Sequence, residues 1–182
     1  MQGMGTVALR AAEPADASAI AAIYAPYVTD TAISFEQVAP TSEVIATRMT
    51  SRPRLPWWVA VDDTTIVGYA YASPYRGRAA YRWSVEVSAY VASSHHGRGV
   101  GTALYQQLLA ELPELGFVSA YAGVALPNPA SVRLHERVGF ELIGVFRNVG
   151  HKFGTWHDVG WWQLRLAEPC TIPEEPREWA PR

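Results

Sequence analysis

The chain has 182 residues, of which 49% are hydrophobic, and 15 basic against 17 acidic residues give a net charge of -2. This length predicts one domain. Because basic residues do not outnumber acidic ones, the charge argues against nucleic acid or an anionic membrane as a partner. A single cysteine, Cys170, excludes an intrachain disulfide, and no apolar run approaches the roughly 20 residues of a membrane span. We therefore expect a soluble, cytoplasmic protein.

Two hydrophobic periods divide the first half of the chain. In four stretches apolar and polar residues alternate, as in a strand. Between the first and the second of these four stretches, apolar residues recur at helical spacing in two further stretches. The pattern predicts two helices there and strands over 6–10, 57–61, 65–71 and 81–91. The last strand has one apolar and one polar face, and the polar face carries Glu86, Ser88 and Tyr90.

The second half begins with a glycine-rich segment that leads into a helix ending near Pro113. We predict a short helix that begins near Ser131, and strands over 117–125, 140–148 and 156–166, the last two joined by a turn over 150–154. Four prolines and several charges predict a flexible tail over 169–182. This order predicts one α+β (mixed α/β) domain over 6–168, without regular βαβ alternation.

Gly97, Gly99 and Gly101 occupy alternate positions just before that helix. Glycines here let the backbone approach a ligand closely and direct free N–H groups at an anion. Thr102 follows the last glycine where a P-loop needs lysine, and the loop follows the polar-faced central strand rather than the first strand of a βαβ unit. Nucleotide hydrolysis and dinucleotide binding are therefore unsupported, and a turn without a ligand is the alternative.

The segment 96–101 resembles the pyrophosphate-binding motif of the GNAT acetyltransferase superfamily. In that motif Gln or Arg, two variable residues, Gly, one variable residue, and Gly or Ala follow the central strand. The segment 128–140 is similar to the family's second signature, at the expected distance downstream. His96 stands where Gln or Arg is usual, a departure that leaves the backbone cradle intact because the cradle depends on glycines.

Further stretches look like the phosphinothricin N-acetyltransferase group, over roughly 7–166; they are 31–36, 68–72, 80–86, 126–128, 134–136 and 154–159. The resemblance implies the GNAT acyl-CoA N-acyltransferase fold, a central, mostly antiparallel, twisted sheet flanked by helices, and a homodimer. It also implies acetyl transfer from acetyl-CoA to the α-amino group of a small amino acid such as phosphinothricin, methionine sulfoximine or methionine sulfone. A GNAT enzyme acting on a protein N-terminus or a polyamine, and a silent acyl-CoA sensor, are the alternatives.

The same resemblance implies the site residues. Glu86 would be the general base, and His135 would protonate the leaving thiolate or join a proton relay; a solvent-facing glutamate and a packed core histidine are the alternatives. Cofactor contacts would come from Tyr90, Val91, Arg98, Gly99, Val100, Gly101, Thr102, Asn128 and Ser131. Acceptor contacts would come from Phe35, Arg76, Arg78, Tyr81 and Ser88, and the reaction needs no metal.

Overall fold

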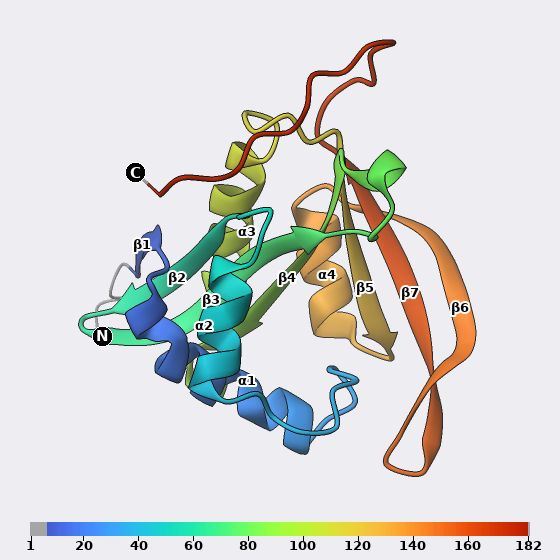
Figure 1. Cartoon of the computed structure of the whole chain (residues 1–182). Coiled ribbons are helices and arrows are strands. Elements are labelled where there is room, and N and C mark those ends of the chain that lie inside the picture. Colours follow the sequence, from blue (N-terminus) through green and yellow to red (C-terminus); the bar gives the residue numbers. More distant parts are fainter. Residues whose placement is uncertain (1–6, 182) are drawn as a thin grey trace.

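The computed structural model describes residues 7–181, and its strands form one sheet. The strands, in sheet order, are β1 (Ala8–Ala11), β2 (Trp57–Asp62), β3 (Thr65–Pro74), β4 (Ser84–Val91), β5 (Ser119–Leu126), β7 (Thr155–Arg165) and β6 (Glu141–Lys152) (Figure 1). Neighbouring strands are antiparallel except for β4 and β5, which are parallel. The predicted mixed, mostly antiparallel sheet is confirmed.

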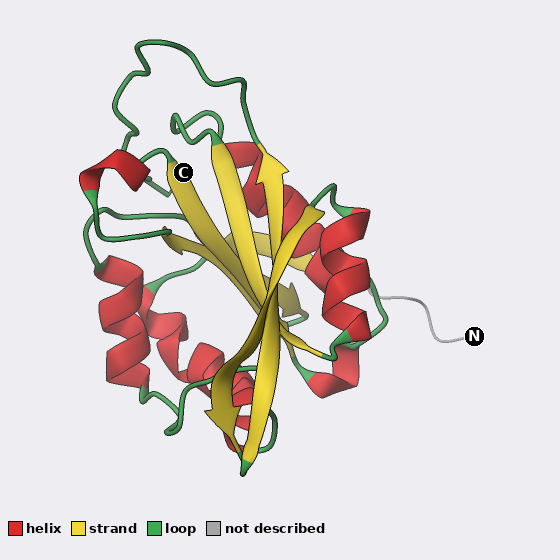
Figure 2. Ribbon diagram, turned by 90° about the vertical axis from the view of Figure 1, so that its right-hand side faces the viewer, coloured by secondary structure: helices red, strands yellow, loops and turns green. Residues whose placement is uncertain are grey.

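Helices cover both faces of the sheet, as Figure 2 shows. The helices α1 (Ala17–Thr29) and α2 (Ser42–Thr50) enclose one core with Trp57, Val59 and Tyr69. The helices α3 (Val100–Glu111) and α4 (Pro129–Arg137) lie on the other face, where α3 contributes Leu104 and Leu108 to the larger core. Within residues 7–181 no helix has both the length and the apolar character needed to cross a membrane.

Several predicted strand boundaries differ from the structure by one to four residues, and residue 6 of the first predicted strand lies outside the described residues. Two of the differences have a clear cause. The strand expected from residue 81 begins at Ser84, because residues 79–81 form a 3-10 turn closed by a hydrogen bond from Tyr81 N to Arg78 O at 3.0 Å. The turn expected over 150–154 is shorter, since Gly150 still pairs with His157 in the β6–β7 ladder. The hairpin turns at Phe153 and Gly154, which both have positive φ.

From the end of β7 to residue 181, the last one described, the chain forms no helix or strand, but it makes defined contacts with the domain. Trp179 is only 6% exposed, and its indole N–H donates to Glu111 Oε2 at 2.7 Å. Glu175 pairs with Arg82 at 2.6 Å. These contacts hold residues 175–179 near α3, where Figure 1 draws the segment in red, and the flexibility expected for 169–182 stays a prediction. A buried indole with a satisfied N–H accounts for this anchoring.

The parallel pair β4–β5 separates halfway along its length. Pairing covers only three steps and ends at Glu86 opposite Tyr121. Beyond this point the strands diverge (Figure 1). Val118 N donates to Trp83 O at 2.8 Å, so the odd-numbered residues of β4 direct their backbone groups toward β5. The backbone N–H and C=O groups of Ala89 and Val91 therefore face the gap between the strands.

Candidate active site

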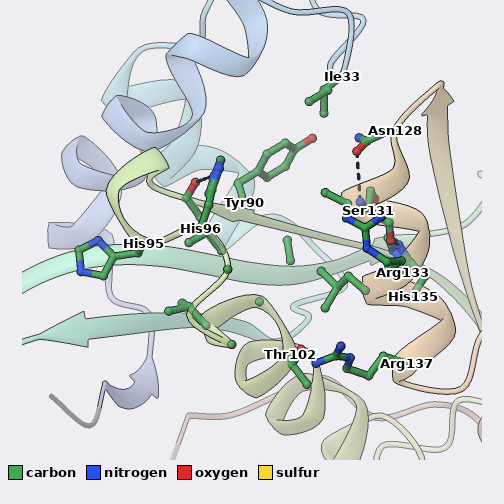
Figure 3. Close-up of a pocket in the computed structure, with 18 of the residues that line it drawn as sticks. Ile33, Tyr90, His95, His96, Thr102, Asn128, Ser131, Arg133, His135 and Arg137 are labelled. Carbon is green, nitrogen blue, oxygen red and sulfur yellow. Dashed lines mark hydrogen bonds between the residues drawn. The ribbon is translucent and has the colours of Figure 1, made fainter. Parts of the chain in front are cut away.

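A cleft of about 390 Å³ occupies the end of this gap, as Figure 3 shows. It lies between the end of β4, the glycine loop, the first turn of α3, and α4. Eight of the nine predicted cofactor residues line it: Tyr90, Val91, Gly99, Val100, Gly101, Thr102, Asn128 and Ser131. A smaller cavity of about 50 Å³ continues inward between β4 and β5, and it is lined by Ser88, Tyr105 and His135 among others.

The glycine loop adopts a backbone that other residues seldom take. Gly97 has φ 73° and Gly99 has φ 81°, both in the left-handed region. A Cβ on Gly101 would lie 3.1 Å from a Leu134 methyl group, so this glycine permits close packing of α3 against α4. The N–H groups of the first turn of α3 have no acceptor inside the helix, and the helix dipole places partial positive charge there. The loop therefore suits a phosphate group.

Two arginines of the cleft are not among the residues predicted from the sequence. Arg133 and Arg137 both line it, and both are exposed. They are four residues apart on α4 and so share one face, with Arg137 drawn beside Thr102 in Figure 3. The i, i+4 spacing just after the Asn128 cap was the available signal. Arg98 does not line the cleft, and its guanidinium lies 4.0 Å from the Asp62 carboxylate.

His96 binds the protein itself. Its Nε2 lies 2.9 Å from Val91 O and 2.8 Å from the Tyr27 hydroxyl, and that hydroxyl also donates to Val91 O at 2.5 Å. A carbonyl oxygen can only accept, so Nε2 carries the proton. The side chain that departs from the family motif thus ties α1 and the glycine loop to the last residue of β4.

Glu86 lies at the point where β4 and β5 separate, opposite Ser73 on one side and Tyr121 on the other. Its side chain is half-buried, and desolvation raises the pKa of its carboxyl group, while the positive charge of Arg76 acts in the opposite direction. A raised pKa makes the carboxylate a better proton acceptor. Ser88, two residues along the same face, lines the smaller cavity.

The predicted acceptor residues Arg76, Arg78 and Tyr81 are only partly assembled around Glu86. The Arg76 guanidinium lies over Tyr75, 4.9 Å from the ring centre, and Tyr81 packs edge-on against the same ring at 5.8 Å. Arg78 is exposed at the start of the 3-10 turn. Tyr75 in turn stacks on Tyr121, the residue paired with Glu86. Arg76 and Tyr81 are therefore linked to Glu86 through two stacked rings, Tyr75 and Tyr121.

Phe35 takes a different place from the one expected. It comes from the α1–α2 loop, but its ring packs on β6, where a Cβ at Gly150 would clash with it, and 6.1 Å from the His157 ring. It lines neither cavity. Ile33, two residues earlier, lines both, and Figure 3 shows it across the cleft from Asn128. The loop between α1 and α2 therefore contributes Ile33 to the site rather than the predicted Phe35.

His135 is a buried histidine with both ring nitrogens engaged. Its Nδ1 lies 2.8 Å from Ser131 O, a carbonyl that can only accept, so Nδ1 carries a proton. Burial lowers the pKa of His135, which favours the neutral ring. Nε2 then accepts the Tyr105 hydroxyl at 2.9 Å. This arrangement agrees with the packed core histidine, although the ring also borders both cavities.

The fold and this site define an acyl-CoA-type acetyltransferase, and the comparisons with known proteins agree. A family model described as "Acetyltransferase (GNAT) domain" matches residues 9–161. The chain belongs to the GNAT family of acetyltransferases.

The names of individual relatives give a more specific activity than the family model does. The chain is 39% identical to a phosphinothricin N-acetyltransferase of Streptomyces viridochromogenes over 165 residues, which cover 90% of each chain. It is 33% identical to an L-methionine sulfoximine/L-methionine sulfone acetyltransferase of Salmonella typhimurium, over 88% of this chain and 95% of that one. A crystal structure of a phosphinothricin acetyltransferase from Sinorhizobium meliloti in complex with acetyl-CoA matches with TM-score 0.88 and 36% identity, covering 93% of this chain and 94% of that one.

Proposed function

We propose that this chain transfers the acetyl group of acetyl-CoA to the α-amino group of a small amino acid such as phosphinothricin, methionine sulfone or methionine sulfoximine. The observation that carries the proposal is the half-buried Glu86 at the separation of β4 and β5, two residues before Ser88, which lines the small cavity leading inward from a cleft that suits an extended anionic ligand. The names of the relatives support this substrate class.

The protein's own groups would bind acetyl-CoA at three points. The N–H groups of residues 99–102 would receive the pyrophosphate, and Arg133 and Arg137 would add positive charge beside it. The backbone N–H and C=O of Ala89 and the N–H of Val91 would pair with the pantetheine amides as with an added strand, while the Val91 carbonyl is held by Tyr27 and His96. Asn128, whose side chain caps α4 by accepting from Ser131 N at 3.1 Å, would close the opposite wall. Acetyl-CoA supplies the thioester carbonyl that the amine attacks.

Glu86 would remove one proton from the substrate ammonium, directly or through a water, because only the free amine has the lone pair that attacks the thioester. A backbone N–H near Val91 would meet the oxyanion. Arg76 and Arg78 would hold the acidic end of the acceptor, and Tyr81 would line its path. Protonation of the thiolate by His135 stays a prediction: since Nε2 accepts from Tyr105, His135 would have to gain a proton before giving one.

The test is a panel of acceptors, with free CoA thiol as the readout. The panel contains phosphinothricin, methionine sulfone, methionine sulfoximine, common amino acids, spermidine and a peptide with a free N-terminus. We expect the first three to react. Reaction of spermidine or the peptide alone would transfer the assignment to the alternative GNAT activities, and binding of acetyl-CoA with no turnover on any acceptor would indicate a silent sensor.

Glu86→Gln tests the mechanism within the same assay. We expect kcat to fall by about 10²-fold or more while acetyl-CoA binding is kept, because a general base contributes roughly that much. Glu141→Gln, an exposed carboxylate on β6, is the matched control and should leave turnover unchanged. Normal turnover in Glu86→Gln would overturn the role of Glu86.

We also propose that the enzyme is a cytoplasmic homodimer. The β6–β7 hairpin exposes several large apolar side chains, each at least 50% accessible: Leu142, Ile143, Phe146, Val149, Phe153 and Trp156. A patch of exposed apolar side chains of this kind marks a protein–protein interaction site. Light scattering on the intact chain should give twice the monomer mass of 20.0 kDa, and Phe146→Glu should return the monomer.

A further inference from the structure

Lys152 is the only lysine in the chain, since one lysine and 14 arginines make up the 15 basic residues. The arginines are mostly exposed, whereas Lys152 is only 3% exposed. An ammonium group is costly to bury without partners. Its Nζ donates to Val28 O at 2.6 Å and to Ser34 O at 2.7 Å. Neither the cofactor cleft nor the general base uses this buried cation.

The two carbonyl groups belong to elements far from β6 in the sequence. Val28 lies in the last turn of α1, where free carbonyl groups and the helix dipole favour a cation. Ser34 lies in the segment 31–36, which we call the acceptor loop. Lys152 therefore joins the tip of the β6–β7 hairpin to the loop that carries Ile33 into the cleft.

A second contact joins the same two parts independently. The Phe35 ring lies directly over Gly150, at a distance that only a glycine permits. The His157 imidazole, which lies beside Phe35, donates from Nε2 to Lys152 O at 3.1 Å. The hairpin thus contacts the acceptor loop at two points: the Lys152 ammonium binds Ser34 O, and Gly150 packs against the Phe35 ring.

The opposite side of the acceptor loop is fastened to α1 and α2. Arg48 holds Glu36 through two hydrogen bonds of 2.8 and 3.1 Å, and the Tyr24 hydroxyl reaches Glu36 at 3.0 Å and Ser34 Oγ at 2.7 Å. With both sides held, we expect the position of Ile33 to depend on the Lys152 contacts as well as on its own backbone bond to Thr31 Oγ1 at 3.1 Å. Loss of the ammonium would leave two buried carbonyl groups without their donor, so the loop would relax.

We propose that Lys152 is a positioning residue for acceptor binding, acting by clamping the acceptor loop to the β6–β7 hairpin. This proposal rests on the proposed function, because the acceptor must meet the thioester at the inner end of the cleft that Ile33 borders. The glycine loop and the arginines of α4 lie outside the clamp. Lys152 thus controls the binding of the amino acid and leaves the binding of CoA to the other end of the cleft.

The first test is steady-state kinetics with methionine sulfone on Lys152→Met, which keeps a long side chain without charge. We expect the acceptor KM to rise about tenfold, as loss of roughly 1.4 kcal/mol would give, while the Kd for CoA stays within about twofold. Lys152→Arg should recover part of the acceptor affinity. Arg147→Met removes an exposed cation of the same strand, paired with Asp158 at 2.6 Å, and should change neither constant. Equal losses for acceptor and CoA, or none for the acceptor, overturn the proposal.

The second test uses the single lysine as its own probe and needs no variant. The intact chain is treated with an N-hydroxysuccinimide acetate ester, and modification of Lys152 is followed by peptide mass spectrometry. We expect Lys152 to react at least about tenfold more slowly in the folded chain than in urea, and more slowly again with acetyl-CoA and N-acetylmethionine sulfone bound, which carry no free thiol or α-amine to consume the ester. Reaction at the unfolded rate, or no further slowing by the two ligands, overturns the clamp.

The two tests separate the clamp from the proposed function. If Lys152→Met does not fold, Lys152→Arg and the labelling of the wild-type chain decide. If no acceptor of the panel is acetylated, the proposed function fails, while slow labelling of Lys152 in the folded chain still supports the contact with the acceptor loop.

Discussion

The two ends of the cleft are built in different ways. The cofactor end consists mainly of backbone groups from consecutive segments: the end of β4, the glycine loop and the first turn of α3. The proposed acceptor end depends on side chains from separate segments: Ile33 of the acceptor loop held by Lys152 lines both cavities, whereas Glu86 and Arg76 lie beyond their lining. Backbone recognition tolerates a departure such as His96, whereas an acceptor site of this kind changes with each contributing side chain.

The largest expected effect is a pH dependence at the acceptor end. Burial raises the pKa of Glu86, so turnover should fall as the pH drops through a value above the ordinary glutamate range. Arg76 lowers this pKa, so Arg76→Met should move the acidic limb of kcat/KM to higher pH. The profile is measured for both chains with saturating acetyl-CoA. An acidic limb that stays in place in Arg76→Met breaks the connection between the arginine and the base.

A second prediction concerns the cofactor end. Gly99→Ala forces a side chain into φ 81°, a strain of about 1 kcal/mol or more. We expect acetyl-CoA affinity to fall about fivefold to tenfold, and acceptor KM at saturating cofactor to stay constant. Gly144→Ala is the matched control, because a Cβ there meets nothing within 4 Å. Calorimetric titration with CoA measures the effect, and equal affinities for both variants would contradict it.

Charge at the cofactor end gives a smaller effect. Arg133→Ala and Arg137→Ala should each weaken CoA binding about threefold to fivefold, most strongly at low salt, because both border the cleft. Arg98→Ala should change binding less than twofold, since Arg98 lies outside it. A larger effect of Arg98 than of the α4 arginines would restore the original expectation from the motif.

The smallest effect is expected at His96. Removing its hydrogen bond to Val91 O in His96→Ala should weaken CoA binding about twofold to threefold, because the Tyr27 hydroxyl still holds that carbonyl. Tyr27→Phe combined with His96→Ala should lose more than the two single changes together. Strictly additive losses, measured by the same titration, would show that the two side chains act separately.

Much of the fold could be read from local patterns. The period-2 runs gave the strands, and the caps and glycines gave the helix starts, because both signals depend on neighbours in the chain. The turn over 150–154 was placed too broadly, since glycine at position 150 serves contact with Phe35 rather than a bend. The anchoring of Trp179 also escaped prediction, as its partner Glu111 is 68 residues away.

The sequence by itself determined the fold class, the GNAT resemblance and the loop of the cofactor end, because glycines and strand alternation act within a few residues. Only the tertiary structure decided which side chains face the cleft: Ile33 rather than Phe35, and the α4 arginines rather than Arg98. It also decided that His135 accepts a hydrogen bond from Tyr105 and that the single lysine is buried. These outcomes depend on burial and on partners distant in sequence, which no local pattern encodes.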